Sequence, residues 1–248
     1  MSDALTMSAR SVRLSMRHLD ALITSLLLPV MLMLVFVELF GGAIETGTKD
    51  YVTYVVPGVI LLCAGFGSAT TAVSVSQDMT GGIVDRFRSM DVGGAAVLSG
   101  HVVASIVRNA ASTTLVVAVA LALGFRPVAD PLAWFAVAGV LLAFVVAVSW
   151  LAATIGLVAG SPEAANGFTF FVMFLPYASS AFVPVDTMPS WLQGFAEHQP
   201  VTPVTETLRG LLLGTPVGSS AVTALLWCAG IAVLSIVAAG ALFQRRTS

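Results

Sequence analysis

The segment SQDMTGGIVDRFRSMDVGGAAVLSG, residues 76–100, decides how the rest of the chain can fold. It is the longest charge-bearing interruption in a sequence that is otherwise almost entirely apolar, and long hydrophobic runs flank it on both sides. Its charged side chains are Asp78, Asp85, Arg86, Arg88 and Asp91. Because charged side chains are costly in hydrocarbon, the segment predicts a loop outside a bilayer that connects two membrane spans.

The composition of the whole chain favours a membrane protein. Of 248 residues, 57% are hydrophobic and 10% are charged, with a mean hydropathy of +0.96. Soluble domains carry about 25% charged residues, so we expect an all-α polytopic protein of the cell membrane. The net charge of -2 and the single lysine, Lys49, argue against a nucleic-acid partner. Cys63 and Cys228 lie in apolar runs, where a thiol acts as a small hydrophobe.

Apolar runs of about the 20 residues needed to cross a bilayer occur six times. They cover residues 22–43, 53–75, 100–124, 132–159, 167–185 and 220–243. Six spans place both termini on the same side of the membrane. The positive-inside rule makes that side cytoplasmic, because it then holds most of the arginines: Arg10, Arg13, Arg17, Arg86, Arg88, Arg245 and Arg246.

Residues 1–20 predict an amphipathic helix that lies in the membrane interface. Apolar residues recur at spacings of four and three from Leu5 to Leu19, and Arg10, Arg13 and Arg17 fall on the opposite face. A helix of this kind buries its apolar face at the acyl boundary and places its guanidinium groups among the head groups.

Residues 186–214 predict an outer hairpin between spans 5 and 6. Pro189 and Trp191 fit a first short helix, and a second is expected from Thr202, with Pro203 in its first turn and Glu206 complementing its N-terminus. Two apolar-faced helices too short to cross must lie on the interface or dip in and return. We therefore expect a re-entrant helical hairpin.

A few residues inside the predicted spans are unusual. Arg108 lies roughly eight residues, or about 12 Å at 1.5 Å per residue, into the third span. Snorkelling or a structural pairing is one reading, and a substrate or proton-relay role is another, in which Glu38 would also take part. Gly156 and Gly160 have the GxxxG spacing that lets helices approach closely. The aromatic residues of span 5 either line a translocation path or pack: Phe170, Phe171, Phe174 and Tyr177.

Three features in this order resemble the ABC-2 type permease family, the membrane subunits of exporters such as the daunorubicin-resistance permeases. They are the Arg-rich amphipathic segment, the inner loop DMTGGIVDRFRSM at residues 78–90, and an outer block. The outer block contains FVP at 182–184, MPSWLQ at 188–193, PVT at 200–202 and LRGLLLG at 208–214. The resemblance covers nearly the whole chain, which we therefore treat as one transmembrane domain, residues 1–248.

The resemblance implies a six-helix permease that dimerises, with a second copy or a paralogue, and pairs with a separate nucleotide-binding ATPase. The family's coupling helix corresponds to residues 76–90 of the cytoplasmic coupling loop at 76–99, and its connecting helix to residues 5–19. Its outer re-entrant hairpin corresponds to residues 189–213, which include Pro189, Trp191, Pro200 and Arg209. Where relatives have a proline, this chain has Asp91, and Gly93-Gly94 supplies the break instead. The residues expected to couple to the ATPase are Asp78, Met79, Gly81, Gly82, Asp85, Arg86, Phe87, Arg88 and Met90.

The sequence argues against nucleotide binding or catalysis in this chain. Residues 42–49, GAIETGTK, nearly match a P-loop, but the lysine is one residue late and Asp50 replaces the Ser or Thr that would hold Mg²⁺. ATP and Mg²⁺ are therefore expected in the partner. His18, His101 and His198 are too far apart for the paired-histidine motif of metalloproteases, so we expect no metal site and no enzyme.

We expect export of a lipophilic or amphipathic substrate such as a drug, antibiotic or natural product. Two alternatives stay open. One is export of a glycolipid or lipid-linked glycan by the same architecture. The other is a proton-coupled secondary transporter that uses Arg108 and Glu38.

Overall fold

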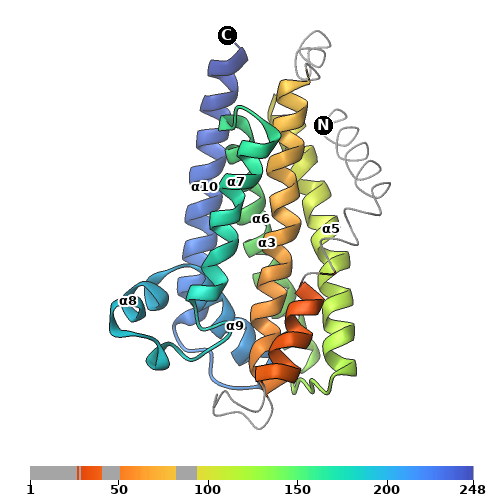
Figure 1. Cartoon of the computed structure of the whole chain (residues 1–248), viewed down its shortest axis with the longest axis vertical. Coiled ribbons are helices and arrows are strands. Elements are labelled where there is room, and N and C mark those ends of the chain that lie inside the picture. Colours follow the sequence, from red (N-terminus) through yellow and green to blue (C-terminus); the bar gives the residue numbers. More distant parts are fainter. Residues whose placement is uncertain (1–26, 28, 41–50, 82–93, 248) are drawn as a thin grey trace.

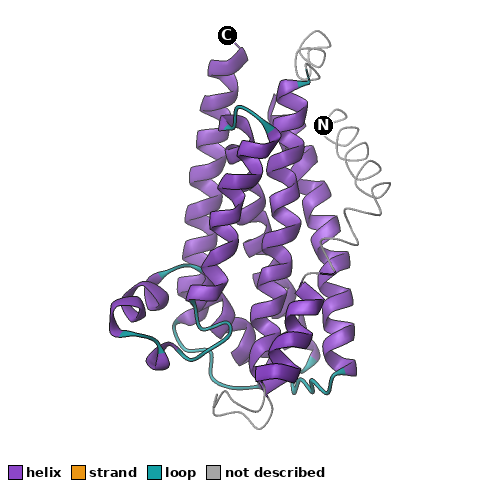
Figure 2. Ribbon diagram, viewed as in Figure 1, coloured by secondary structure: helices purple, strands orange, loops and turns teal. Residues whose placement is uncertain are grey.

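A computed structural model describes residue 27 and residues 29–40, 51–81 and 94–247. The described secondary structure is entirely helical (Figure 2). Four helices are long and apolar enough to cross a membrane: α3 (Tyr51–Thr80), α5 (Gly94–Ala122), α6 (Pro131–Val158) and α10 (Ser220–Thr247). The prediction of an all-helical membrane protein is therefore confirmed at this level.

The remaining described helices are shorter. Residues Pro29–Leu39 are helical and end in the π-helical turn η1 (Phe36–Phe40). Helix α7 (Pro162–Phe174) continues into the 3-10 turn η2 (Leu175–Ala178), and η3 (Val185–Thr187) follows. Helices α8 (Ser190–His198) and α9 (Val201–Leu213) then precede α10. Both short helices of the predicted hairpin are present, and α9 begins one residue before the predicted start.

Local sequence signals explain where the helices begin and end. Asp130 caps α6, its carboxylate accepting from Ala133 N (2.7 Å), and Pro131 takes the first position. Ser161 caps α7 in the same way, accepting from Ala164 N (3.2 Å) before Pro162. Gly214 ends α9 in the left-handed region, with φ of 66°.

Helix α3 is the central helix of the bundle. It packs against α5, α6 and α7, and α10 packs against α6 on the side away from α3 (Figure 1). The largest core cluster centres on α3, where Val55, Val56 and Leu61 are fully buried. Glycines allow close approach: a Cβ at Gly58 would lie 2.6 Å from Ala181 Cβ. One at Gly156 would collide with the carbonyl oxygen of Ala72 on α3.

Several predicted spans differ from the bounds of the helices that contain them. The third helix begins at Gly94, not at residue 100, so Arg108 lies roughly 21 Å from its start at 1.5 Å per residue. The fifth predicted span, 167–185, starts instead at the Ser161-Pro162 cap and loses α-helical geometry before Pro176. Gly160 follows the end of α6 and faces open space, so only Gly156 of the predicted GxxxG pair serves close packing.

The bundle has two ends. At one end lie the C-terminus, the end of α3 and the start of α5, and we call it the C-terminal end (Figure 1). At the other end lie η2, α9 and the connections 123–130 and 214–219, with α8 projecting sideways, and we call it the α9 end (Figure 1). Of the first predicted span, only residue 27 and residues 29–40 belong to the described part of the chain.

Candidate functional site

The base of the predicted coupling loop lies at the C-terminal end of the bundle. Helix α3 ends at Thr80, and Gly81 N donates to Gln77 O (2.8 Å). Asp78 Oδ2 lies 3.0 Å from His101 Nε2 on α5, and both side chains are largely buried. The Asp78 carboxylate thus has a partner inside the chain, and it ties α3 to α5 where the loop leaves them.

Most of the predicted coupling residues lie outside the described residues and stay predictions. These are Gly82, Asp85, Arg86, Phe87, Arg88 and Met90, together with Arg10, Arg13 and Arg17 of the predicted interfacial helix. Of the coupling set, the structure places Asp78, Met79 and Gly81, at the end of α3.

The aromatic residues of span 5 form a ladder of ring contacts along α7 and η2. Phe170 and Phe174 meet edge to face at 4.8 Å, and Phe174 lies 5.9 Å from Tyr177. Tyr177 stacks on Phe182 (5.3 Å), and Phe182 stacks on Phe36 of η1 (4.6 Å). Phe170, Phe174 and Tyr177 are exposed, and so is the neighbouring Phe171 at 76%. On the outside of a membrane bundle, an exposed aromatic face is available to lipid, to another chain or to an apolar ligand.

Arg108 lies in the middle of the bundle, at the contact between α5 and α3. Its Nε and Nη2 donate to Gly67 O (3.2 and 2.8 Å), and Nη2 also donates to Thr71 Oγ1 (3.2 Å). The structure therefore supports a structural pairing for Arg108, because its guanidinium donates to the backbone of α3. Glu38 is exposed in η1.

A buried polar network lies beside Arg108 and begins at the next residue of α5, Asn109. Asn109 Nδ2 donates to Ser105 O (3.0 Å), and Ser149 Oγ on α6 donates to Ser105 Oγ (2.8 Å). Ser68 on α3 shares a further bond with Ser149 (3.3 Å). The network joins α3, α5 and α6, and hydrogen bonds of this kind hold transmembrane helices together.

At the α9 end, the predicted hairpin residues separate into exposed and buried ones. Trp191 on α8 is 79% exposed, whereas Arg209 on α9 is 8% exposed. Pro189 and Pro200 stand immediately before α8 and α9. Glu206, predicted to complement the N-terminus of α9, instead accepts from Arg209 Nη1 (2.7 Å).

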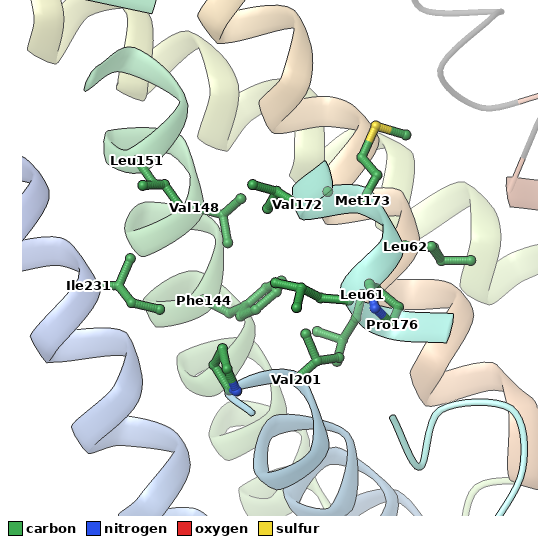
Figure 3. A pocket seen from close by; sticks show the side chains of 13 residues that line it. Leu61, Leu62, Phe144, Val148, Leu151, Val172, Met173, Pro176, Val201 and Ile231 are labelled. Atoms are coloured by element: carbon green, nitrogen blue, oxygen red, sulfur yellow. The ribbon is translucent and has the colours of Figure 1, made fainter. Parts of the chain in front are cut away.

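A small apolar cavity of about 40 Å³ lies where α3, α6, α7, α9 and α10 meet (Figure 3). Leu61, Phe144, Val148, Met173 and Ile231 are among its lining residues. On α7 the cavity is lined by Val172 and Met173, and none of the ladder residues Phe170, Phe174 and Tyr177 is among its lining residues. The cavity and the exposed aromatic ladder are therefore separate features.

Within the part of the chain that the structure describes, no group of three or more His, Cys, Asp and Glu side chains is placed to hold a metal ion. His101 and His198 lie at opposite ends of the bundle, on α5 and α8. Cys63 and Cys228 are buried free thiols inside apolar helices, as the sequence indicated.

The family profile of ABC-2 type transporters matches residues 3–213 of the chain. The chain belongs to the ABC-2 type transporter family. Over 195 residues, 78% of this chain and 69% of the relative, it is 32% identical to the daunorubicin resistance ABC transporter permease protein DrrB1 of Streptomyces coeruleorubidus. Over 225 residues, 89% of this chain and 80% of the relative, it is 27% identical to the probable doxorubicin resistance ABC transporter permease protein DrrC of Mycobacterium tuberculosis.

Membership in the ABC-2 family and the four long apolar helices identify a multi-pass membrane protein whose relatives are permease subunits. For an ABC-2 protein, family membership also implies an ATPase partner.

Two features of this ABC-2 chain were not found by sequence reasoning. His101 is 23 residues from Asp78, and Phe182 stacks on a ring 146 positions earlier, Phe36. Neither separation fits a helical repeat, because each contact forms between two different elements. The unusual polarity of His101 near the start of an apolar helix was the one available signal for the first pair.

Proposed function

We propose that the chain is the membrane subunit of an ATP-driven exporter that moves a lipophilic or amphipathic substrate out of the cell. ATP and Mg²⁺ bind to a separate nucleotide-binding chain that docks on the loop at 76–99. The observation that carries the proposal is α3, a single helix of 30 residues, about 45 Å at 1.5 Å per residue. It begins beside Phe182 at the α9 end and ends at the base of the loop.

In this mechanism the docked ATPase moves the end of α3. Because α3 packs against α5, α6 and α7, its movement is transmitted to the whole bundle. The Asp78–His101 pair joins α3 to α5, so both helices that flank the loop respond together. Phe87 and Met90 supply apolar anchors for the ATPase, and Arg86 and Arg88 supply orienting charges.

The topology in this proposal has six spans, with both termini in the cytoplasm. Four of the six spans are the four long helices. The other two are the segment around Pro29–Leu39 and α7 with η2. Helices α8 and α9, which are too short to cross, form an outer re-entrant hairpin. The C-terminal end of the bundle is then the cytoplasmic end, in keeping with Arg245 and Arg246 in the last turns of α10.

The exposed aromatic face of α7 and η2, which consists of Phe170, Phe171, Phe174 and Tyr177, is the proposed lining of the translocation path, completed by a second copy or a paralogue of the chain. Aromatic faces bind amphipathic molecules through stacking and burial of apolar area. The relatives carry daunorubicin and doxorubicin resistance in their names, so daunorubicin is the first probe for transport by the reconstituted complex.

Two pairs of variants test this proposal. Arg86→Glu with Phe87→Ala should abolish co-purification of the ATPase and ATP-dependent daunorubicin transport together. Phe171→Ala should lower transport at least severalfold without loss of the ATPase, whereas Phe135→Ala should not. Phe135 is the matched control because it is a phenylalanine of equal exposure, 77%, on another helix. Full transport and assembly in the loop variant would overturn the docking role.

The same vesicles separate the alternatives. Uptake of a fluorescent lipid-linked glycan in place of daunorubicin would identify a glycolipid exporter. Transport that persists without ATP and collapses with a protonophore would identify a proton-coupled transporter.

A further inference from the structure

Arg209 joins three segments at the α9 end. Its Nη2 donates to Ser180 O (2.7 Å), between η2 and η3, and to Tyr54 O (3.2 Å) on α3. Nη1 donates to Glu206 on its own helix, α9, and the guanidinium carbon lies 3.7 Å from the centroid of the Tyr54 ring. We call Arg209, Glu206, Tyr54 and Ser180 the Arg209 cluster.

The contacts of this cluster require an arginine. A planar guanidinium can donate to two carbonyls, pair with a carboxylate and stack on a ring at the same time, whereas a lysine ammonium is a point charge on a flexible stem. The side chain is 8% exposed, and burying a cation is costly unless its donors are used. Arg209 therefore holds α9 and the 179–184 segment against α3 only while all three segments stay in place.

The cluster is nevertheless incomplete. Arg209 Nε and Ser180 Oγ are both buried, and neither has a hydrogen-bond partner among the described residues. Buried polar atoms without protein partners cost free energy, so these two atoms favour a rearrangement in which they gain partners. A contact of this kind can hold one state of a protein and be released in another.

We propose that Arg209 is a positioning residue that keeps the α9 end closed in the resting state and releases it when α3 moves. This proposal rests on the proposed function, because the movement originates at the other end of α3, where the loop begins. Tyr54 lies in the first turn of α3 and Asp78 in its last, so one helix connects the Arg209 cluster with the Asp78–His101 pair.

The test measures how fast a cysteine introduced at position 180 reacts. Ser180 is 3% exposed, and its Oγ makes no hydrogen bond in the structure, so Ser180→Cys removes no described contact. The native thiols are removed with Cys63→Ala and Cys228→Ala. The full chain is placed in nanodiscs, where a polar maleimide reaches both membrane faces, alone and with its ATPase.

With Arg209 intact, we expect slow labelling of the introduced thiol at rest. Arg209→Lys should label at least tenfold faster at rest, and Glu206→Gln should give an intermediate rate because Glu206 is the more exposed partner. Thr207→Val is the matched control: Thr207 is buried on the same helix, but its hydroxyl bonds only within α9, to Pro203 O (2.7 Å). It should label at the parent rate. Thermal denaturation of each variant distinguishes local opening from general unfolding.

The outcomes separate this inference from the proposed function. If Arg209→Lys and Glu206→Gln are folded and label at the parent rate, the positioning role is wrong. If the Thr207→Val control labels as fast as Arg209→Lys, the effect belongs to α9 packing and the role is also wrong. Faster labelling of the parent on adding MgATP to the complex supports release during the cycle. Fast labelling of Arg209→Lys without any MgATP response of the parent would support the closing contact and overturn its release. Daunorubicin uptake driven by MgATP in the same complex then tests the proposed function separately.

Discussion

The two ends of the helical bundle are held together in different ways. At the α9 end, buried side chains donate to the backbone of several segments: Arg209 reaches α3 and the 179–184 segment, Gln199 reaches both Leu175 O and Ala178 O, and Tyr51 Oη reaches Phe182 O (2.8 Å). At the C-terminal end, the described links join two helices at a time, as between Asp78 and His101.

This difference indicates where the chain depends on itself and where it depends on a partner. Bonds from side chains to backbone carbonyls fix the path of the connecting segments, because each unpaired buried carbonyl would cost free energy. The α9 end carries its own scaffold in this way. The loop at the C-terminal end carries arginines and aspartates instead, and in the proposed function a second chain supplies their partners.

The largest effect on stability is expected from Gly58→Ala, which would disrupt the packing of α3 against the 179–184 segment at the α9 end. The added Cβ would lie 2.6 Å from Ala181 Cβ and 2.7 Å from Ala181 O, so α3 and the 179–184 segment must separate. We expect a loss of about 2–3 kcal/mol in the free energy of unfolding, in the range for overpacked cores. Denaturation in a mixed detergent system measures it.

Gly65→Ala is the matched control for that change. Gly65 lies two turns further along α3, and no atom comes within 4 Å of the position of its Cβ. Replacing glycine by alanine inside a helix then stabilises by about 0.5–1 kcal/mol. Equal effects of the two substitutions would show that the contact between α3 and Ala181 does not limit stability.

A smaller loss is expected from Gln199→Ala. Gln199 is buried, and its Nε2 donates to Leu175 O (3.0 Å) and Ala178 O (3.1 Å), which closes the η2 turn onto the start of α9. Without it, two carbonyls lose a donor, and we expect a loss of about 1–2 kcal/mol. Gln193→Ala is the control, because Gln193 also donates to two carbonyls but near the surface of α8. If the control costs as much, burial does not distinguish the two sites.

The long helices and the two short ones after η3 could be predicted from the sequence, because each signal is local. Apolar runs predicted α6 and α10, and Pro189 with Trp191 and Pro203 near Thr202 predicted α8 and α9. Contacts between distant residues could not be predicted. The outer motif identified Arg209, but the sequence did not indicate its hydrogen-bond partners. Tyr54 and Ser180 come close to Arg209 only because α3 packs on α9 in the folded chain.

Arg108 illustrates the same limit inside the membrane. The predicted depth of Arg108 depended on where α5 begins. Gly93-Gly94 is compatible with the end of one helix or with the start of the next, so the sequence alone did not determine that start. Once α5 starts at Gly94, Arg108 is too deep to reach the C-terminal end easily, and its guanidinium donates to the Gly67 carbonyl instead. Glycine at position 67 lets α5 approach α3 closely here, because a Cβ at Gly67 would collide with Oδ1 of Asn109, the residue next to Arg108.

The smallest effect is expected from the Asp78–His101 pair at the C-terminal end. A cycle of Asp78→Asn, His101→Gln and the double variant should give a coupling of about 0.5–1 kcal/mol, the net contribution of one hydrogen bond between largely buried side chains. If the proposed function holds, the ratio of daunorubicin moved to ATP hydrolysed should fall in each single variant, because α3 and α5 would no longer move together. A coupling above about 2 kcal/mol would show that this end also carries its own scaffold, and the contrast with the α9 end would then be wrong.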